Sequence, residues 1–442
     1  MKRAAVTSLT VISISALLAG CGGGNGSGSG GGGGKDAGPS PGTQAKSKEP
    51  VELVFYSPQS PRTVEQFMKE RGNDTQAKFP NYKITFIPYA KGTETADLIA
   101  SGQPIDIIMS TTSTINEIVD FGLQYDISGL IQKNKYDLGR LEPSVVQFMR
   151  DFSGGGMYGL PVSTDIFTLF YNKNLFDKFG VPYPKEGSTW DDIYDLAKKM
   201  TRTDGGTQYY GLTMSVSHML NNNQLSAPSY DPKTNKVMIE DDKYKTVVDQ
   251  FSRFFRLAGD DKAKETMSKW QDYFRKDQTA AMMAWYGVGL LDTPVQFEWD
   301  VVSMPYFKES PNVAPQYVPS YMEIASISKH KDEAFEVLAY LTSDEYQLKR
   351  SKEGVQTVLN NPDIRKAFAQ NQESYKGKNL KPYAPEKAAA ITPKDKYSGI
   401  AGGKAYSAFQ KIVSGQSDAN SALREAAEAA KQEIETAKSK TK

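Results

Sequence analysis

The stretch from Tyr158 to Phe176, YGLPVSTDIFTLFYNKNLF, contains two apolar, strand-forming runs that are separated by a short polar step around Asp165. Residues 158–162 form the first run and residues 167–171 form the second. We interpret both runs together as one long extended segment, because each is short, apolar and rich in strand-forming side chains. Such a segment is suited to carry the chain from one lobe of a protein to another.

Before this segment, short apolar runs alternate with helical patterns. Strands are predicted at three places, namely residues 53–56, Tyr82–Ile87 and residues 105–109. A helix is predicted to begin with Ser60 as its N-cap and Pro61 in its first turn, and another is predicted at residues 96–100. Strands and helices that alternate at this spacing predict an α/β lobe with a mostly parallel sheet.

After the segment, the α/β pattern continues. Thr189-Trp190-Asp191-Asp192 has the pattern of a capping box, with Thr189 as the N-cap of a helix. Residues 230–235 predict a turn between two short extended segments. Strands at residues 301–305 and 323–327 predict a second passage between lobes. Longer helices are predicted at four places, namely residues 244–257, 263–277, 332–341 and 418–438.

The N-terminus has the pattern of a secretory signal. Cys21 is the only cysteine, small residues stand directly before it, and residues 4–19 carry no charge. The pattern resembles a bacterial lipoprotein signal, which implies that residues 1–20 are removed and that Cys21 is lipidated and anchors the protein to the outer face of the cell membrane. An ordinary secretory signal that happens to precede a cysteine is the alternative. Residues 21–50 are rich in Gly and Ser and are expected to form a disordered tether, as suits a Gram-positive cell surface.

Charge and residue usage exclude several classes of function. The chain has 53 basic and 52 acidic residues, so its charge gives no preference for nucleic acid. Only two histidines occur, His218 and His330, and the one cysteine is assigned to lipid. This composition removes most zinc sites and disfavours a Ser-His-Asp triad. We therefore predict neither a metal nor a cofactor.

Several short motifs occur in a fixed order along the chain. They include Tyr158-Gly159-Leu160-Pro161, Leu169-Phe170-Tyr171-Asn172-Lys173, Thr189-Trp190-Asp191, Thr279-Ala280-Ala281-Met282, Trp299-Asp300-Val301 and Ile324-Ala325-Ser326-Ile327. Together they resemble the family 1 extracellular solute-binding proteins of ABC importers, a family that includes maltose-binding protein. The resemblance covers residues 49–435.

The resemblance implies a type II periplasmic-binding fold, in which two α/β lobes are joined by a hinge and the ligand lies in the cleft between them. The first lobe is expected to comprise residues 51–162 and 303–350, and the second lobe residues 163–302 and 351–442. The family expectation is a monomer that captures a carbohydrate, here an oligosaccharide, and delivers it to the permease subunits of an ABC transporter. No bond of the solute is broken, so no enzyme activity is expected.

The candidate ligand-binding residues come from six places in the chain. Asp165 lies six residues before Tyr171, where the resemblance places a ligand-contacting acidic residue; a hinge carboxylate that accepts backbone hydrogen bonds is the alternative. Trp285 and Tyr286 are expected on a loop as an aromatic platform for a sugar ring, with core packing as the alternative. The family platform lies slightly later, near Val288, which leaves the position of the contact open.

The remaining candidates follow or precede predicted strands, where ligands of open α/β sheets gather. They are Tyr56 and Gln59 at the end of the first strand, Ser110 at the end of the third, and Tyr321 and Glu323 before the later crossing strand. One more candidate, Trp270, lies in the helix predicted at residues 263–277, where a buried helix face shared with Phe274 is the alternative. Trp190 and Trp299 are expected to pack structurally instead.

Two other classes of function stay open at this point. A tethered carbohydrate-active enzyme, either a glycoside hydrolase or a lyase, would need two carboxylates on separate strands. A receptor for a solute that is not a sugar would keep the same fold with another cleft. Aromatic residues in the candidate cleft segments favour a carbohydrate.

Overall fold

The computed structural model describes residues 50–287, 290 and 295–441. Residues 49–442 form one compact unit, and the predictions for the signal peptide, Cys21 and most of the tether lie outside the described residues. Within the described part, none of the helices combines the length and the apolar character needed to cross a bilayer.

The first lobe is built on a five-stranded sheet with the order β2-β1-β3-β12-β4. β1 pairs in parallel with β2 and β3, whereas β12 runs antiparallel to β3 and β4. The strands are β1 (Val51–Tyr56), β2 (Tyr82–Ile87), β3 (Ile107–Thr111), β4 (Gly159–Ser163) and β12 (Ser320–Ile324). The helices are α1 (Val64–Phe67), α2 (Asn73–Lys78), α3 (Thr95–Ala100), α4 (Ile115–Asp120), α5 (Ser128–Lys133), α6 (Pro143–Phe152), α13 (Lys331–Leu341), α14 (Asp344–Lys352) and α15 (Pro362–Lys366).

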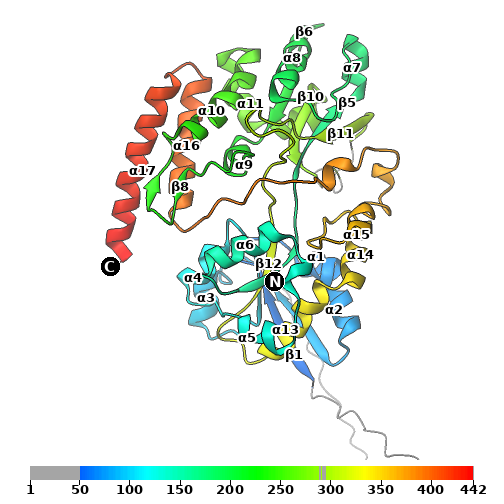
Figure 1. Cartoon of the computed structure of the whole chain (residues 1–442), viewed down its shortest axis with the longest axis vertical. Coiled ribbons are helices and arrows are strands. Elements are labelled where there is room, and N and C mark those ends of the chain that lie inside the picture. The colour runs from blue at the N-terminus through cyan, green and yellow to red at the C-terminus, as the bar shows by residue number, and fades with distance from the viewer. Residues whose placement is uncertain (1–49, 288–289, 291–294, 442) are drawn as a thin grey trace, which may run out of the picture. The chain divides into compact units, whose positions relative to one another are not determined.

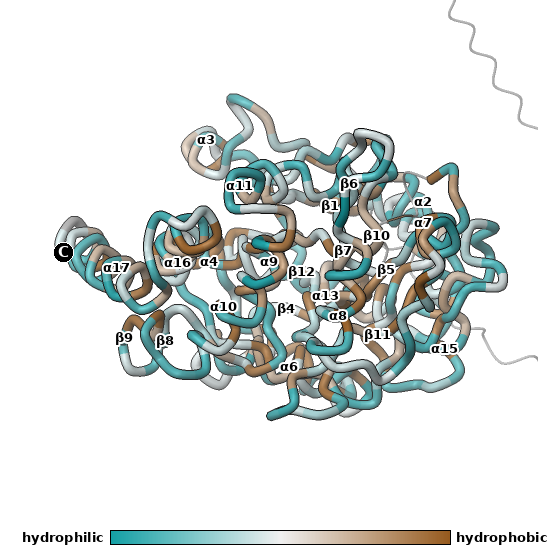
Figure 2. The backbone as a smooth tube through the Cα atoms, turned by 90° about the horizontal axis from the view of Figure 1, so that it is seen from above, coloured by the Kyte–Doolittle hydropathy of each residue, from teal (hydrophilic) through white to brown (hydrophobic). Residues whose placement is uncertain are grey.

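The second lobe contains a five-stranded sheet with the order β11-β5-β10-β7-β6 and a separate hairpin, β8-β9. The strands are β5 (Phe167–Asn172), β6 (Arg202–Asp204), β7 (Thr207–Met214), β8 (Tyr230–Asp231), β9 (Lys236–Val237), β10 (Ala280–Tyr286) and β11 (Trp299–Ser303). The helices are α7 (Lys173–Phe179), α8 (Trp190–Met200), α9 (Val216–Asn221), α10 (Asp242–Phe255), α11 (Asp260–Ser268), α12 (Trp270–Arg275), α16 (Ser398–Val413) and α17 (Ala419–Thr441). Figures 1 and 2 both show α17 beside the β8-β9 hairpin.

The chain passes between the two sheets where the sequence predicted. β4 belongs to the first sheet and β5 to the second, so the chain crosses between Ser163 and Phe167. It returns between β11 and β12, as the second predicted passage requires. The two-lobed α/β prediction is therefore confirmed.

A third passage follows α15. Ile364 packs in the core of the first lobe, whereas Phe368 packs in the core of the second lobe. Phe307, which lies after β11, still belongs to the second-lobe core. The cores therefore place the lobe boundaries later than the expected positions 303 and 351, because a segment stays with the sheet that buries its apolar side chains.

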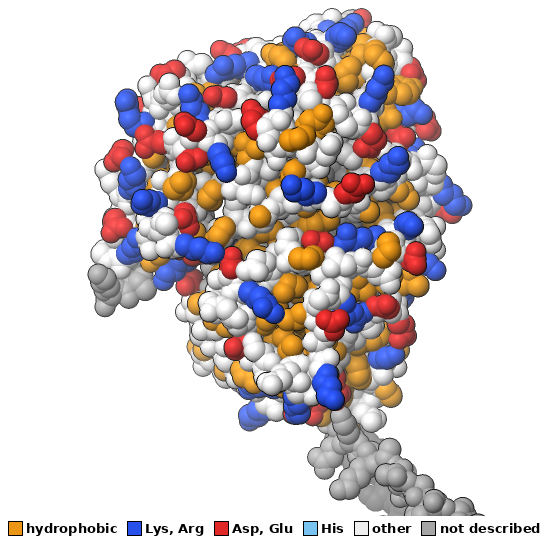
Figure 3. Space-filling view, viewed as in Figure 1, with side chains coloured by type: hydrophobic (Ala, Val, Ile, Leu, Met, Phe, Trp, Pro, Cys, Tyr) orange, Lys and Arg blue, Asp and Glu red, His pale blue; other side chains and the backbone are white. Residues whose placement is uncertain are grey.

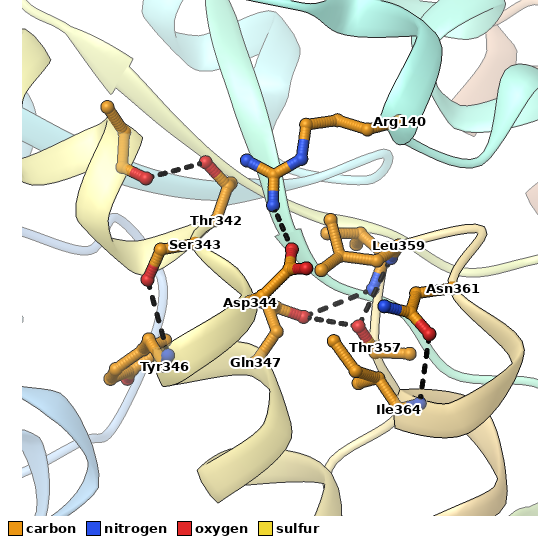
Figure 4. Close-up of polar contacts among 12 residues, drawn as sticks. Arg140, Thr342, Ser343, Asp344, Tyr346, Gln347, Thr357, Leu359, Asn361 and Ile364 are labelled. Carbon is orange, nitrogen blue, oxygen red and sulfur yellow. Dashed lines mark hydrogen bonds and ion pairs between the residues drawn. The ribbon is translucent and has the colours of Figure 1, made fainter.

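Gln347 in α14 fixes the segment that leads into the third passage. Its Nε2 donates to the carbonyl oxygens of Val162 (2.8 Å) and Leu341 (2.7 Å), and its Oε1 accepts from Thr357 Oγ1 (2.7 Å). Figure 4 shows this amide between α14 and the strand-like segment that precedes α15. One buried side chain thus joins the end of β4, just before the first passage, to the segment that leads into α15.

Several local predictions were wrong by a few residues. The first helix begins at Val64 with Thr63 as its N-cap, and not at Ser60, because Thr63 and Gln66 form a capping box. The helix predicted at residues 263–277 is broken at Lys269 into α11 and α12. By contrast, the capping box at Thr189 is confirmed.

Trp190 and Trp299 are buried, as expected of structural residues. The Trp190 indole packs edge-on against Phe251, with ring centroids 5.1 Å apart, and its Nε1 donates to Gln224 Oε1 at 3.0 Å. Trp299 lies against Phe170 with centroids 5.6 Å apart. Both rings therefore hold the second lobe together.

Gly211 marks the closest approach of α8 to the second sheet. A Cβ atom at this position would lie 2.2 Å from the carbonyl oxygen of Ala197 and 2.5 Å from its Cα. We expect Gly211→Ala to lower the free energy of unfolding by about 1–3 kcal/mol or more, because helix backbone cannot rotate away as a side chain can. Chemical denaturation measures this change.

A matched control lies in α16. Gly403 is exposed in the interior of this helix, and a Cβ atom there meets nothing within 4 Å. Gly403→Ala is expected to raise the free energy of unfolding by about 0.5–1 kcal/mol through helix propensity. Equal effects of the two substitutions would contradict the steric account of Gly211.

Candidate functional site

A cavity of about 140 Å³ lies between the two lobes. Its first-lobe wall comes from the loop after β3 and the start of α4, and its second-lobe wall comes from α9 and the segments before β8 and α16. Ligands of open α/β sheets gather beyond the carboxyl ends of strands, so the position after β3 marks a candidate binding site. The side chains that can exchange hydrogen bonds with a polar ligand there include Thr112, Ser113, Asn116, Asn221, Ser229, Thr392 and Lys394.

A second hollow of about 420 Å³ adjoins the first. The two share Asn116 and the segment Pro393-Lys394-Asp395. Aromatic side chains from both lobes line the second hollow, namely Phe148, Phe152, Tyr158 and Tyr397. The cleft therefore combines a polar cavity with a more aromatic extension.

Two ion pairs connect the lobes at the second hollow. Lys233 Nζ, in the β8-β9 turn, lies 3.1 Å from Asp151 Oδ2 of α6. Lys396 Nζ lies 3.8 Å from Asp120 Oδ1 at the end of α4. The hydrogen bond from Lys233 lowers the pKa of Asp151. On the face shown in Figure 3, basic and acidic side chains are interspersed, in keeping with the balanced charge of the chain.

An aromatic cluster surrounds the end of β10. The Trp285 ring centroid lies 4.5 Å from Tyr286, 4.5 Å from Trp270 and 5.0 Å from His218. Tyr286 packs in turn against Phe167, with centroids 4.5 Å apart. Trp285 and Tyr286 are half-buried and belong to a strand, which corrects the expectation of a loop. The rings are thus fixed by pairing of β10 with β5 and β7.

Asp165 lies at the first passage between lobes and contacts the residue after the aromatic pair. Its Oδ1 accepts hydrogen bonds from the N–H groups of Ile166 (2.8 Å) and Gly287 (3.2 Å). Burial raises the pKa of Asp165 to about 7, although these two hydrogen bonds oppose the rise. The carboxyl is therefore only partly ionised at neutral pH, and it can either accept or donate a hydrogen bond.

His218 connects the aromatic cluster to the cavity wall. It lies in α9, whose Asn221 lines the cavity, and its Nδ1 is 2.7 Å from Ser215 Oγ. Burial lowers the pKa of His218, and the positive charge of Lys394 lowers it further. The His218 ring is thus neutral and lies between the aromatic cluster and the cavity wall.

The structure brings together four of the predicted residues, namely Asp165, Trp270, Trp285 and Tyr286. Trp270 is half-buried, and its ring lies against Trp285. These four surround the first passage and the end of β10. None of them lines either hollow, and α9 contacts the aromatic cluster through His218 and the first hollow through Asn221.

Tyr56 and Tyr321 lie in the core of the first lobe instead. Tyr56 is fully buried, and its hydroxyl is 3.0 Å from Thr95 Oγ1. Tyr321 is fully buried as well, and its hydroxyl donates to the carbonyl oxygen of Val145 at 2.7 Å. The prediction that these two tyrosines lie at the cleft was wrong, because central strands of the sheet have both faces covered.

Ser110 and Glu323 are also buried, and one hydrogen bond joins them. Ser110 Oγ donates to Glu323 Oε1 at 2.5 Å across the pairing of β3 with β12. Burial raises the pKa of Glu323 to about 8. The expected ligand contact of these two residues is thus replaced by an internal polar pair.

Gln59 is exposed beyond the end of β1. Its Nε2 donates to Glu117 Oε2 of α4 at 2.6 Å, and its backbone has a left-handed φ of 57°. Gln59 therefore stays at the carboxyl edge of the sheet, where it was expected, but it is engaged with a neighbouring helix.

Sequence reasoning did not predict the residues that line the two hollows, nor the contact of His218 with the aromatic cluster. His218 was weighed only for zinc and triad chemistry, and Lys394 and Tyr397 were not considered. In the sequence, Lys394 follows a proline and stands among turn-forming residues, a pattern that indicates an ordinary lysine in a loop. A tyrosine directly before a helix pattern, as at Tyr397, was the one available signal.

Comparisons with known proteins agree with this architecture. The sequence model of the bacterial extracellular solute-binding protein family matches residues 57–348. The galactooligosaccharide-binding protein of Bacillus subtilis (strain 168) is 22% identical over 374 residues, which cover 80% of this chain and 82% of that protein. Brucella abortus proteins named only as binding proteins are 27% identical over 117 residues, and the match spans 26% of their length.

Solved structures show the same fold. An ABC substrate-binding protein of Listeria monocytogenes in complex with cycloalternan superimposes with a TM-score of 0.68 at 18% identity, over 87% of this chain and 99% of that chain. A sugar transporter protein of Rhizobium etli in an open conformation also has a TM-score of 0.68 at 18% identity, over 86% of this chain and 99% of that chain.

Proposed function

Because this chain belongs to the family of bacterial extracellular solute-binding proteins, we propose that it captures an oligosaccharide in the cleft between its lobes and delivers it to an ABC permease. The observation that carries the proposal is the pairing of a polar interlobe cavity with an aromatic cluster at the end of β10. Sugars need both kinds of surface, since their C–H faces stack on aromatic rings and their hydroxyls exchange hydrogen bonds.

The proposed roles follow from the geometry of the two lobes. Asp165, held by two backbone N–H groups at the first passage, offers its remaining oxygen to sugar hydroxyls. Trp285 and Tyr286 offer ring faces from the second lobe, and Thr112 and Ser113 offer hydroxyls from the first. A ligand that contacts both walls favours the closed arrangement by the free energy of those added contacts.

The known relatives support a sugar as the solute. The Bacillus subtilis relative is named for galactooligosaccharides, and the Listeria structure holds a cyclic oligosaccharide. We propose that the solute is released unchanged, as expected of a binding protein. Anchoring of a monomer through a lipidated Cys21 belongs to the same proposal and rests on the sequence alone.

Thermal unfolding in the presence of sugars tests the proposal. At a concentration of about 100 times Kd, a ligand that binds only the folded state adds about 2.7 kcal/mol to the free energy of unfolding. We expect Tm to rise by several degrees with one class among galacto-oligosaccharides, malto-oligosaccharides and cycloalternan, and to change little with free galactose.

Two further measurements complete this test. Chromatography of the sugar after incubation should return it intact, because a binding protein breaks no bond. Asp165→Asn should reduce the rise in Tm while the protein stays folded. An unchanged Tm across all three neutral sugar classes and with an acidic oligosaccharide would contradict the assignment of a carbohydrate ligand, and a cleaved sugar would show an enzyme.

A further inference from the structure

Resting on the proposed function, we infer that Lys394 selects acidic carbohydrates, in which a carboxylate on the sugar lies against its ammonium group. Lys394 lies in the segment between the third passage and α16, and it lines both the polar cavity and the aromatic hollow. A solute that fills either space must therefore pass close to this side chain.

Lys394 has no counter-ion among the residues that the structure describes. In the part of the chain that the structure describes, its ammonium makes neither a hydrogen bond nor an ion pair. Burial alone lowers its pKa to about 8, with no neighbouring carboxylate raising it. The group therefore remains mostly protonated at neutral pH although its side chain is half-buried.

The carboxylates around the two hollows are already engaged. Asp151 pairs with Lys233 and Asp120 pairs with Lys396. Asp395 Oδ1 accepts the backbone N–H groups of Tyr397 and Ser398 at the start of α16. Lys394 is thus the cation that these three carboxylates leave uncompensated.

An anionic substituent on the ligand would remove this imbalance. A buried charge is costly unless it is paired, and a charge-assisted hydrogen bond is about twice as strong as a neutral one. A hydroxyl can also accept from Lys394, but it leaves the charge uncompensated. The hydroxyl and amide groups opposite, such as Asn116 and Asn221, suit the neutral remainder of a sugar. The chemistry of the cleft therefore favours a uronate-containing oligosaccharide over its neutral counterpart.

Calorimetric titration of the full chain with two matched probes tests this inference. The probes are the linear trimer of galacturonic acid and the linear trimer of galactose, at neutral pH and constant ionic strength. We expect the acidic trimer to bind at least about tenfold more tightly, as a charge-assisted hydrogen bond to a desolvated group allows. Lys394→Met should abolish this preference, because the variant has no ammonium group to pair with the carboxylate.

Lys396→Met is the matched control, because Lys396 lines the same hollow but is paired with Asp120. It should keep the preference for the acidic trimer. Equal or tighter binding of the galactose trimer, or a preference that survives in Lys394→Met, would overturn the inference and leave the proposed function intact. Absence of binding by every sugar, neutral and acidic, would instead overturn the proposed function itself.

Discussion

Trp285→Ala is expected to weaken binding of the oligosaccharide ligand by about 10- to 100-fold, which corresponds to about 1.4–2.7 kcal/mol. The ring is half-buried at the end of β10 and is held between Trp270 and His218. A ring that is fixed before the ligand arrives loses little conformational entropy on stacking, so its removal costs most of the contact. Calorimetric titration with the sugar that gives the largest rise in Tm measures the loss.

Two variants distinguish a loss of ring stacking from a general loss of stability. Trp285→Phe keeps an aromatic face and should recover part of the affinity that Trp285→Ala loses. Trp299→Phe changes a fully packed tryptophan of the same lobe, only 5% exposed, and should lower Tm while Kd stays within about threefold. If Trp285→Ala lowers Tm as Trp299→Phe does and leaves Kd unchanged, Trp285 is a core residue and the aromatic platform lies elsewhere.

The passages between the lobes could be predicted because short runs of strand-forming residues mark them in the sequence. The runs on either side of Asp165 became β4 and β5, and the run around Val301 became β11. Strand-forming residues in short runs carry this information locally. The break of the predicted helix at Lys269 could not be foreseen, since the apolar positions around it continue and only tertiary packing separates α11 from α12.

The site was predicted less well, and β12 shows why. The sequence placed the strand at residues 323–327 and Ser320-Tyr321-Met322-Glu323 directly before it, which made Tyr321 and Glu323 candidates for ligand contact. In the structure β12 lies between β3 and β4, and residues 321–324 are all buried. A central strand has no solvent face, and its place in the sheet depends on pairing with strands far away in the sequence.

Lys394 could not be predicted from the sequence for a different reason. Nothing in the local sequence distinguishes it from a loop lysine, because its environment comes from α4, α9 and the segment before β8. The fold brings together the residues of an interlobe cleft from separate segments of the chain. Local sequence patterns therefore predict the hinge more readily than the residues that line the cleft.

Glu323→Gln is expected to flatten the decline of stability with pH. Burial raises the pKa of Glu323 from 4.5 to about 8, and its Oε2 has no hydrogen-bond partner in the described structure. The stability that the protonated carboxyl provides is therefore fully present below about pH 4.5 and is lost as the pH rises through about 8. The two pKa values set an upper limit of roughly 5 kcal/mol on this loss.

Urea denaturation at several pH values measures this effect. Glu323→Gln cannot ionise, so its free energy of unfolding should fall less than that of the unaltered chain between about pH 5 and pH 8. Asp165, with its pKa raised to about 7, contributes a second decline that Asp165→Asn should remove. Ser110→Ala is the control within the pair: the Ser110 hydroxyl lowers the pKa of Glu323, so its loss should move the decline to higher pH. A pH profile that is the same in Glu323→Gln and the unaltered chain would mean that Glu323 ionises freely, which would return it to the candidates for ligand contact.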